Sequence, residues 1–236
     1  MMYDPIELGK KTEKIVCKDG KRKYYRFRAT RFYGGSATAD TVGCNLRCVY
    51  CWNWRINNNP SAYGTFYSPV DVARRLSSMA RRHGYTYVRV TGGEPTLCFS
   101  HLLELIDAIP SHYIFILETN GILLAEERRV KELSSFPNIY VRVSLKGVDG
   151  ESFSRITGAK PEYFDYQMRA LELLHRYNVA ARPAIPVNLF PLERIKELQR
   201  KLLEIDESYI LELEPIIDYG GAYKRLRDAG LSIYSY

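Results

Sequence analysis

Short β-rich runs alternate with helix-patterned stretches along most of the chain, and this alternation most limits the possible folds. From residue 37 onward, each β-rich run is bounded by turns, and the stretches between runs carry apolar residues at helical spacing. Strands that alternate with helices pair in parallel, with the helices outside the sheet. The predicted strands are the segment before Cys44 and residues 86–91, 113–118, 139–144, 179–187 and 209–214.

About six strand–helix units are predicted, and their number narrows the architecture. A complete eight-unit barrel usually needs ~250 residues, whereas this chain has 236. We therefore expect an α/β fold that forms an open, partial (β/α)6 barrel with parallel strands. A doubly wound, Rossmann-like sheet is the alternative. In both architectures ligands bind at the C-terminal ends of the strands.

The positive charge of the chain is concentrated near its N-terminus. The formal net charge is +7, yet ten Lys or Arg between Lys10 and Arg31 stand against two acidic residues, so the remaining chain is close to neutral. Asp19-Gly20 between two strand-like runs indicates a hairpin. We predict a small basic β-hairpin in an N-terminal extension (1–36), outside the main partial-barrel domain (37–236).

Composition and cysteine usage predict a cytoplasmic globular protein. Hydrophobic residues make up 46% of the chain and charged residues 26%, as is typical of globular proteins. No apolar run approaches the ~18 residues of a membrane span, and the N-terminus lacks the apolar region of a signal peptide. Five cysteines, with three of them within eight residues, favour a metal site in a reducing compartment over a disulfide framework. Cys98 is expected to be a small buried apolar residue.

Three cysteines follow the first predicted parallel strand with CxxxCxxC spacing. Cys44, Cys48 and Cys51 lie in residues 43–53, here called the Cys loop. Each iron of a four-iron cluster needs its own ligand, so three thiolates leave one iron open to a small chelating molecule. The alternative is part of a zinc site, which normally has four ligands. The spacing alone leaves both interpretations open.

A second motif, residues 92–95 or the GGEP segment, directly follows the strand at 86–91. Gly92 and Gly93 would let the backbone approach a ligand closely. Glu94 offers a carboxylate at the end of a strand, which suits an α-amino group. Taken alone, the segment could also be an ordinary turn.

Together, the Cys loop and the GGEP segment resemble the radical S-adenosylmethionine (SAM) superfamily. The resemblance implies that Cys44, Cys48 and Cys51 bind a 4Fe-4S cluster whose open iron chelates SAM. In that family the reduced cluster cleaves SAM to methionine and a 5′-deoxyadenosyl radical, which abstracts hydrogen from the substrate. The resemblance also implies SAM contacts, with Tyr50 against the adenine and with Gly92, Gly93 and Glu94 holding the methionine amino group.

Later segments resemble, more narrowly, pyruvate formate-lyase activating enzyme and its relatives. Residues 118–121, the ETNG segment, stand where those enzymes often have Asp-Thr-Asn-Gly, and residues 144–146 where they have Asp-Leu-Lys. The resemblance implies that Glu118, Ser144 and Lys146 lie near the ribose and carboxylate of SAM. Strand-end solvation is the alternative for these three. Ser144 and Ile217 depart from the family pattern, which leaves the outer SAM contacts and the activation of a glycyl radical enzyme open.

The resemblance leaves the substrate unidentified. We expect a macromolecule, with a protein favoured over an RNA base, and a one-electron donor such as ferredoxin or flavodoxin. Basic grooves with aromatic side chains bind single-stranded nucleic acid, so the basic hairpin is a candidate docking surface for an acidic partner, and a solvated hairpin is the alternative. A non-enzymatic zinc- or nucleic-acid-binding module is the remaining interpretation. The aromatic residues of the hairpin are Tyr24, Tyr25 and Phe27.

Overall fold

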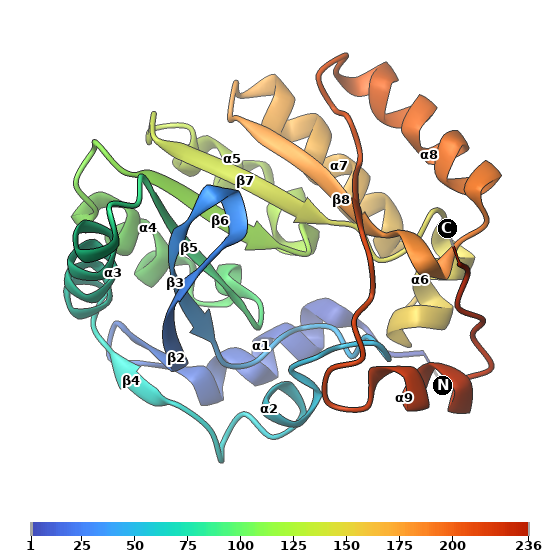
Figure 1. The fold of residues 1–236 in the computed structure, drawn as a ribbon, viewed down its shortest axis with the longest axis horizontal. Coiled ribbons are helices and arrows are strands. Elements are labelled where there is room, and N and C mark those ends of the chain that lie inside the picture. Colours follow the sequence, from blue (N-terminus) through green and yellow to red (C-terminus); the bar gives the residue numbers. More distant parts are fainter. Residues whose placement is uncertain (1, 236) are drawn as a thin grey trace.

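Nine strands form one sheet in residues 2–235, the part of the chain that the computed structural model describes. Their order is β1-β2-β3-β5-β6-β7-β8-β9, and β4 pairs with β2. The six strands β3 and β5 to β9 pair in parallel, and helices lie along their outer side (Figure 1). The strands are β1 Cys17–Lys18, β2 Lys21–Thr30, β3 Ser36–Thr41, β4 Thr65–Tyr67, β5 Tyr87–Gly92, β6 Ile114–Thr119, β7 Ile139–Ser144, β8 Ala181–Pro186 and β9 Glu212–Glu214.

The helices between the strands begin and end at recognisable signals. Ser68 caps α3 by accepting a hydrogen bond from the Asp71 backbone N–H, and Gly84 ends the same helix in the left-handed conformation. The α-helices are α1 Pro5–Val16, α2 Trp54–Asn58, α3 Pro69–His83, α4 Phe99–Ala108, α5 Glu127–Leu133, α6 Gly150–Thr157, α7 Tyr163–Arg176, α8 Leu192–Ile205 and α9 Ala222–Asp228. Short 3-10 helices lie at η1 Phe32–Gly34, η2 Pro95–Leu97, η3 Ile122–Ala125 and η4 Val187–Leu189.

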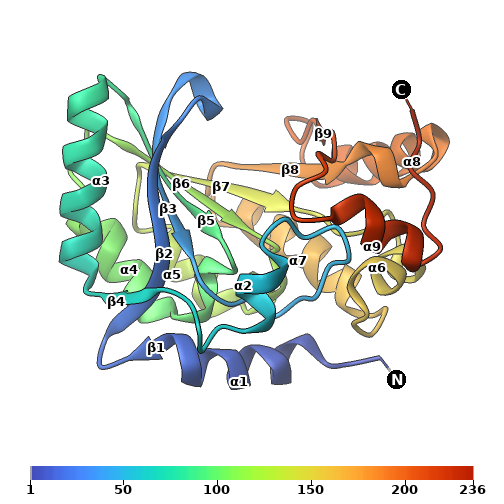
Figure 2. The same ribbon diagram turned by 60° about the horizontal axis from the view of Figure 1, so that its bottom comes forward.

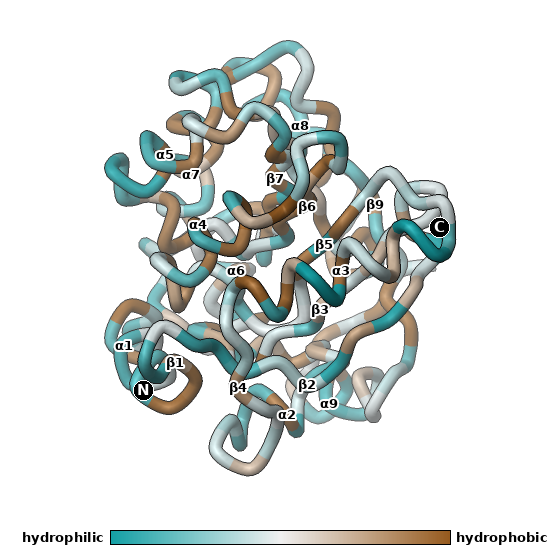
Figure 3. The backbone as a smooth tube through the Cα atoms, turned by 90° about the vertical axis from the view of Figure 1, so that its left-hand side faces the viewer, coloured by the Kyte–Doolittle hydropathy of each residue, from teal (hydrophilic) through white to brown (hydrophobic). Residues whose placement is uncertain are grey.

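The predicted partial barrel is confirmed, because the parallel strands occupy the predicted segments and the sheet ends at β9 without closing. Successive side chains of each strand face opposite sides of the sheet. One side is apolar and packs under the helices, and Figure 3 shows the hydrophobic stretches along β6 and β7. The other, inner side carries charged residues. The buried apolar members include Val88, Val90, Phe115, Leu117, Val141 and Val143, and the inner charged members include Arg89, Glu118 and Arg142.

The N-terminal segment differs in part from the prediction. The turn at Asp19-Gly20 does join an antiparallel pair, β1 and β2. However, residues 14–16 belong to helix α1, which the sequence analysis missed, and β2 pairs with β3. The expectation that the hairpin lies outside the β/α core is therefore wrong, although the boundary between residues 36 and 37 stays a prediction. Figure 2 shows α1 crossing below one end of the sheet, beneath α2.

Two of the basic residues of this segment are buried, against the expectation of an exposed docking surface. Arg22 is 1% exposed and Lys23 is 8% exposed. The Lys23 ammonium donates to the carbonyls of Pro60 and Ser61 and lies over the Phe66 ring. Both side chains donate to backbone carbonyls inside the protein. A docking surface would therefore have to be formed by the remaining basic residues.

The cysteine pairing also corrects the sequence analysis. Cys17 and Cys98 form a disulfide across 81 residues of sequence, whereas Cys44, Cys48 and Cys51 are free. Cys98 is buried as expected, but it is covalently paired and is not an inert apolar residue. Among residues 2–235 no helix is long and apolar enough to cross a membrane.

Candidate active site

The Cys loop begins where β3 ends and is shaped by the N-terminal helix. Gly43 has φ +85°, and a Cβ at this position would lie 2.7 Å from Thr12 and 2.9 Å from Val16 of α1. The Tyr3 hydroxyl accepts a hydrogen bond from the Arg47 backbone N–H. Only glycine therefore lets the chain turn into the Cys loop this close to α1.

Several N–H groups point at the cysteine sulfurs. Cys44 Sγ accepts from the Leu46 backbone N–H at 3.3 Å and from Asn120 Nδ2 at 3.8 Å. Cys51 Sγ accepts from Asn57 Nδ2 at 3.6 Å. Donors to sulfur are among the groups that tune an iron–sulfur cluster. The three free thiols and their N–H partners thus fit a four-iron cluster in which three irons each bind one thiolate.

Electrostatics at the thiols is dominated by burial. Burial raises the pKa of all three thiols, and for Cys48 it outweighs the nearby Lys146 charge, so that the pKa rises to about 11. Cysteine must be deprotonated to bind a metal. The free protein therefore holds these groups as thiols, and loading the site releases protons. Among residues 2–235 no group of three or more His, Cys, Asp or Glu side chains is arranged to hold one metal ion.

The GGEP segment packs directly on the Cys loop. A Cβ on Gly93 would lie 2.0 Å from the Gly43 carbonyl oxygen, and one on Gly92, whose φ is +99°, would lie 2.7 Å from the Thr41 nitrogen. The Gly93 N–H donates to the Thr41 carbonyl and the Glu94 N–H to the Gly43 carbonyl, at 2.8 and 2.7 Å. The two glycines thus allow close approach to the protein's own backbone, where the sequence suggested a ligand.

Glu94 links the GGEP segment to the end of β6. Its Oε1 accepts from the Thr96 N–H, the Thr96 hydroxyl and the Thr119 hydroxyl, and its Oε2 accepts from the Asn120 N–H. The residue is 1% exposed. These donors come from the protein, so a contact with the amino group of SAM stays a prediction.

Asn120 of the ETNG segment bridges to the Cys loop. Its Nδ2 donates to Asn45 Oδ1 at 2.7 Å, and Gln167 of α7 donates to its carbonyl. The Asn45 Nδ2 is buried without a protein partner, which is consistent with a bound group at this place. The sequence analysis missed Asn45 and Gln167. Asn45 lies within the CxxxCxxC spacing and carries no signal of its own, and Gln167 lies in the middle of α7.

A charged ladder, defined as Arg89, Glu118, Arg142, Glu212 and Glu214, crosses the inner side of the sheet. Glu118 Oε2 lies 3.1 Å from Arg89 Nη2, and its Oε1 lies 4.0 Å from Arg142 Nη1. Arg142 also binds Glu212 at 3.0 Å and Glu214 at 2.7 Å. Burial would raise the pKa of Glu118, but the two guanidinium groups outweigh it and lower the pKa.

Glu118 is therefore engaged by protein groups, and the Tyr33 hydroxyl also donates to it at 2.8 Å. Lys146 and Ser144 lie together at the end of β7, with 2.6 Å between Lys146 Nζ and Ser144 Oγ. Lys146 Nζ is 5.7 Å from the centre of the Tyr50 ring. The structure thus brings Tyr50 and Lys146 together beside Cys48, and their contacts with SAM stay predictions.

Comparison with known proteins assigns the chain to a family. The model of the radical SAM superfamily matches residues 39–205, which span both the Cys loop and the GGEP segment. The chain belongs to this superfamily, whose members use a 4Fe-4S cluster and SAM. The predicted superfamily is thus confirmed and the zinc-module alternative is set aside.

Two curated relatives and one solved structure illustrate the similarity. A GTP 3′,8-cyclase of Mycolicibacterium smegmatis is 38% identical over 137 residues, which cover 53% of this chain and 36% of the cyclase. The mycofactocin maturase MftC of the same organism is 32% identical over 135 residues, which cover 57% of this chain and 32% of the maturase. Streptococcus suis SuiB bound to precursor peptide SuiA has a TM-score of 0.66 at 20% identity, over 82% of this chain and 43% of SuiB.

The chain thus spans about a third of these two curated relatives. The similar curated relatives include GTP 3′,8-cyclases and a maturase, so the narrower resemblance to pyruvate formate-lyase activating enzyme is not confirmed. The likeness to SuiB shows the fold alone.

Proposed function

We propose that Cys44, Cys48 and Cys51 hold the 4Fe-4S cluster and that SAM binds between the Cys loop, the GGEP segment and the end of β7. The observation that carries this proposal is the group of three free thiols, with N–H donors to two of the sulfurs, in a loop hydrogen-bonded to the GGEP and ETNG segments. When bound, the cluster supplies one electron to SAM, which gives methionine and a 5′-deoxyadenosyl radical that abstracts hydrogen from the substrate.

The residues of this chain have separate tasks in the proposal. The Gly43, Gly92 and Gly93 backbones hold the Cys loop against the GGEP segment, while Asn120 donates to Cys44 Sγ and to Asn45. Lys146 is the candidate partner for the SAM carboxylate, and Tyr50 is the candidate contact for the adenine. A one-electron donor such as ferredoxin or flavodoxin, in the cytoplasm, completes the proposal.

Anaerobic reconstitution tests the cluster assignment. The protein should bind four irons and four sulfides per chain and, with a strong reductant, convert SAM slowly to methionine and 5′-deoxyadenosine. Replacing Cys44, Cys48 and Cys51 together by Ala should remove iron and SAM cleavage. Cys98→Ser is the matched control, because the sulfur of Cys98 is bonded to Cys17 outside the Cys loop and this variant should keep the iron. Iron that survives the triple change would place the cluster elsewhere.

The substrate is proposed to be a protein or peptide, and the open side of the barrel supports this choice. β9 is the last strand of the sheet within residues 2–235, and exposed apolar side chains follow it: Ile217 is 60% exposed and Tyr219 61%. Arg225 of α9 donates to the Val49 and Cys51 carbonyls. This apolar surface therefore adjoins the Cys loop, and Figure 2 shows α9 near α2.

Two further observations bear on the substrate class. The structural neighbour SuiB is known bound to a precursor peptide. The burial of Arg22 and Lys23 weakens the case for RNA on the basic hairpin. A nucleotide such as GTP is the second candidate, because the curated relative at 38% identity is a GTP 3′,8-cyclase.

Anaerobic turnover separates these substrates. Peptides or proteins encoded beside the gene, RNA and GTP are each added, and 5′-deoxyadenosine formation above the substrate-free rate is measured. With the true peptide, Ile217→Glu and Tyr219→Glu should lower coupled turnover at least fivefold and leave substrate-free SAM cleavage intact. Val70→Glu is the matched control, because Val70 is 65% exposed on the distant helix α3. Stimulation by GTP or RNA alone would refute the peptide proposal.

A further inference from the structure

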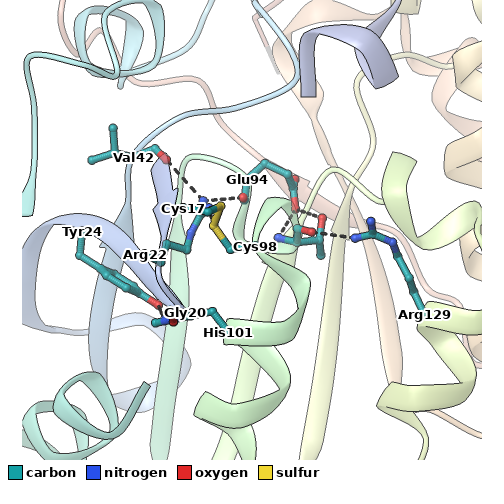
Figure 4. Close-up of a disulfide and its surroundings, with 10 residues drawn as sticks. Cys17, Gly20, Arg22, Tyr24, Val42, Glu94, Cys98, His101 and Arg129 are labelled. Carbon is teal, nitrogen blue, oxygen red and sulfur yellow. Dashed lines mark hydrogen bonds between the residues drawn. A yellow bond between two sulfur atoms is a disulfide. The ribbon is translucent and has the colours of Figure 1, made fainter. Parts of the chain in front are cut away.

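The disulfide lies at a junction of three segments that shape the Cys loop. Cys17 directly follows α1, and Cys98 follows η2 and precedes α4; their Cα atoms are 5.9 Å apart. Helix α1 packs on the Cys loop, because a Cβ on Gly9 would contact Asn45 and one on Gly43 would contact Thr12. The bond therefore ties the helix that covers the Cys loop to the chain just after the GGEP segment (Figure 4).

Arg22 is the neighbour that makes this disulfide chemically unusual. Its Nη1 lies 2.9 Å from Cys98 Sγ and 3.9 Å from Cys17 Sγ. Its Nη2 donates to the Glu94 carbonyl at 2.7 Å and to the Val42 carbonyl at 3.4 Å, as Figure 4 shows. Its Nε is buried without a partner. Burial lowers the pKa of this guanidinium.

Within residues 2–235, no carboxylate lies within salt-bridge distance of Arg22. A buried cation without an ion-pair partner is costly, and the hydrogen-bond partners of this guanidinium are two carbonyl oxygens and the two sulfurs. Reduction of the disulfide would supply the missing anion, since a thiolate at Cys98 would lie in contact with the guanidinium. A nearby cation favours a thiolate over a thiol, and whatever stabilises the reduced form makes a disulfide more easily reduced.

We propose that Cys17 and Cys98 form a redox-active thiol–disulfide site whose reduced state is an ion pair between the Cys98 thiolate and Arg22. In its oxidised state the same site fixes α1 to the segment after GGEP. The site would undergo thiol–disulfide exchange with a dithiol. This inference goes beyond the proposed function and does not depend on it.

The exchange can be written so that electrons and protons balance. One thiolate of the dithiol attacks the Cys17 sulfur, which belongs to a half-buried residue, and the S–S bond breaks with Cys98 leaving as a thiolate beside Arg22. The second thiolate of the reagent then closes the reagent's disulfide and releases Cys17, which takes up a proton. The protein gains two electrons and one proton, and one proton of the dithiol passes to solvent.

The proton count gives a test on the unmodified protein. The reconstituted protein is equilibrated anaerobically with mixtures of reduced and oxidised dithiothreitol, quenched in acid and alkylated, and the Cys17 and Cys98 peptides are read by mass spectrometry. Below the pKa of the reagent thiols, about 8.5 or higher, a Cys98 thiolate requires the equilibrium constant to rise tenfold per pH unit from pH 6 to 8. A pH-independent constant would overturn the proposal.

Other titratable groups around Arg22 are Glu13 of α1, Tyr24 of β2, Glu94 and Cys44. His101 of α4 bonds to Tyr24, and burial lowers its pKa to about 4, below the pH range of the test. Burial raises the pKa of Tyr24 and Cys44, which places their titration above that range. The tenfold dependence is expected of Cys98 because its sulfur gains a negative charge when the disulfide is reduced, whereas the neighbouring groups keep the same covalent state in both forms.

A variant and a control test the role of Arg22. Arg22→Gln should require at least tenfold more reduced over oxidised dithiothreitol for half reduction, because the cation is gone. Arg31→Gln, at an exposed position just after β2, should leave the ratio unchanged. An unchanged ratio in Arg22→Gln would refute the ion pair, and the pH test on the unmodified chain decides the matter if that variant does not fold.

Amide hydrogen exchange tests the structural consequence. Exchange in α1 should be faster in the reduced protein than in the oxidised one, because the covalent tie to the GGEP side is lost. Cys17→Ser should exchange at the fast rate in both buffers. Two results would overturn the proposal. One is an α1 exchange rate that is the same in reducing and oxidising buffers, and the other is alkylation of both cysteines under oxidising conditions.

Discussion

Because Gly93 packs closely on the Cys loop, the addition of one methyl group in Gly93→Ala should cause a large loss of stability. Gly93→Ala adds a Cβ that would lie 2.0 Å from the Gly43 carbonyl oxygen, whereas Cβ contacts under 3.0 Å are essentially absent from proteins. The two segments must therefore separate by about 1 Å. A separation of that size stretches the hydrogen bond from the Glu94 N–H to the Gly43 carbonyl, now 2.7 Å, beyond the normal range.

The magnitude follows from the groups that lose their partners. Each buried backbone hydrogen bond contributes about 1 kcal/mol, and leaving a buried donor or acceptor unpaired costs about 1–3 kcal/mol. With the bond of the Gly93 N–H to the Thr41 carbonyl also disturbed, the expected loss is about 3–5 kcal/mol in the free energy of unfolding. A typical domain has a total of only about 5–15 kcal/mol.

Urea denaturation followed by circular dichroism measures this loss, and iron content after reconstitution reports on the Cys loop. Gly84→Ala is a matched control, because Gly84 has φ +67° and no atom within 4 Å of the added Cβ. It should lose only the ~1–2 kcal/mol of a left-handed backbone. If Gly93→Ala loses no more than Gly84→Ala and binds iron normally, the close packing described here is incorrect.

Three further predictions follow from the site and its surroundings. Glu118→Gln leaves Arg89 facing no carboxylate within the charged ladder, so the free energy of unfolding should fall by about 3–5 kcal/mol, whereas the exposed Glu204→Gln should change it little in the same urea titration. His101 is buried, and burial lowers its pKa to about 4. Because the unfolded chain binds this proton more readily, about 3 kcal/mol of the free energy of unfolding, present above pH 6.5, should be lost as pH falls towards 4. The free energy of unfolding of His101→Phe should depend less on pH. Glu94→Gln removes a charged acceptor, whose hydrogen bond contributes roughly 1.5–3 kcal/mol, so the Kd for SAM should rise about tenfold or more. Thr119→Val keeps the charge of Glu94 and should raise the Kd for SAM much less. Equilibrium dialysis measures both Kd values.

Local patterns predicted the strands and the Cys loop because both depend on neighbours in sequence. The alternation of β-rich and helical segments located β5 to β9, and CxxxCxxC spacing located the three thiols. Helix α1 could also have been found, since Asp4 caps it and Pro5 begins it.

Other features depend on distant residues and had no local signal. The Cys17–Cys98 disulfide joins positions 81 residues apart, and an odd cysteine count favoured metal binding. The sequence places Arg22 in the basic hairpin, a candidate docking surface, yet its guanidinium is buried and donates to the backbone carbonyls of Val42 and Glu94. The donors to Glu94 from the end of β6 likewise become visible only when the strands are assembled.

The charged ladder has a consequence for the width of the barrel opening. Arg142 reaches from β7 past β8 to two carboxylates on β9, a strand of only three residues. The position of this last strand is thus set by the reach of one side chain as well as by backbone pairing. Because the guanidinium is buried, salt should affect the opening little, whereas replacing Glu212 and Glu214 by Gln would remove both ion pairs that hold β9 to Arg142. Changes at Glu212 and Glu214 would thus be expected to alter the width of the barrel opening without a direct effect on the Cys loop.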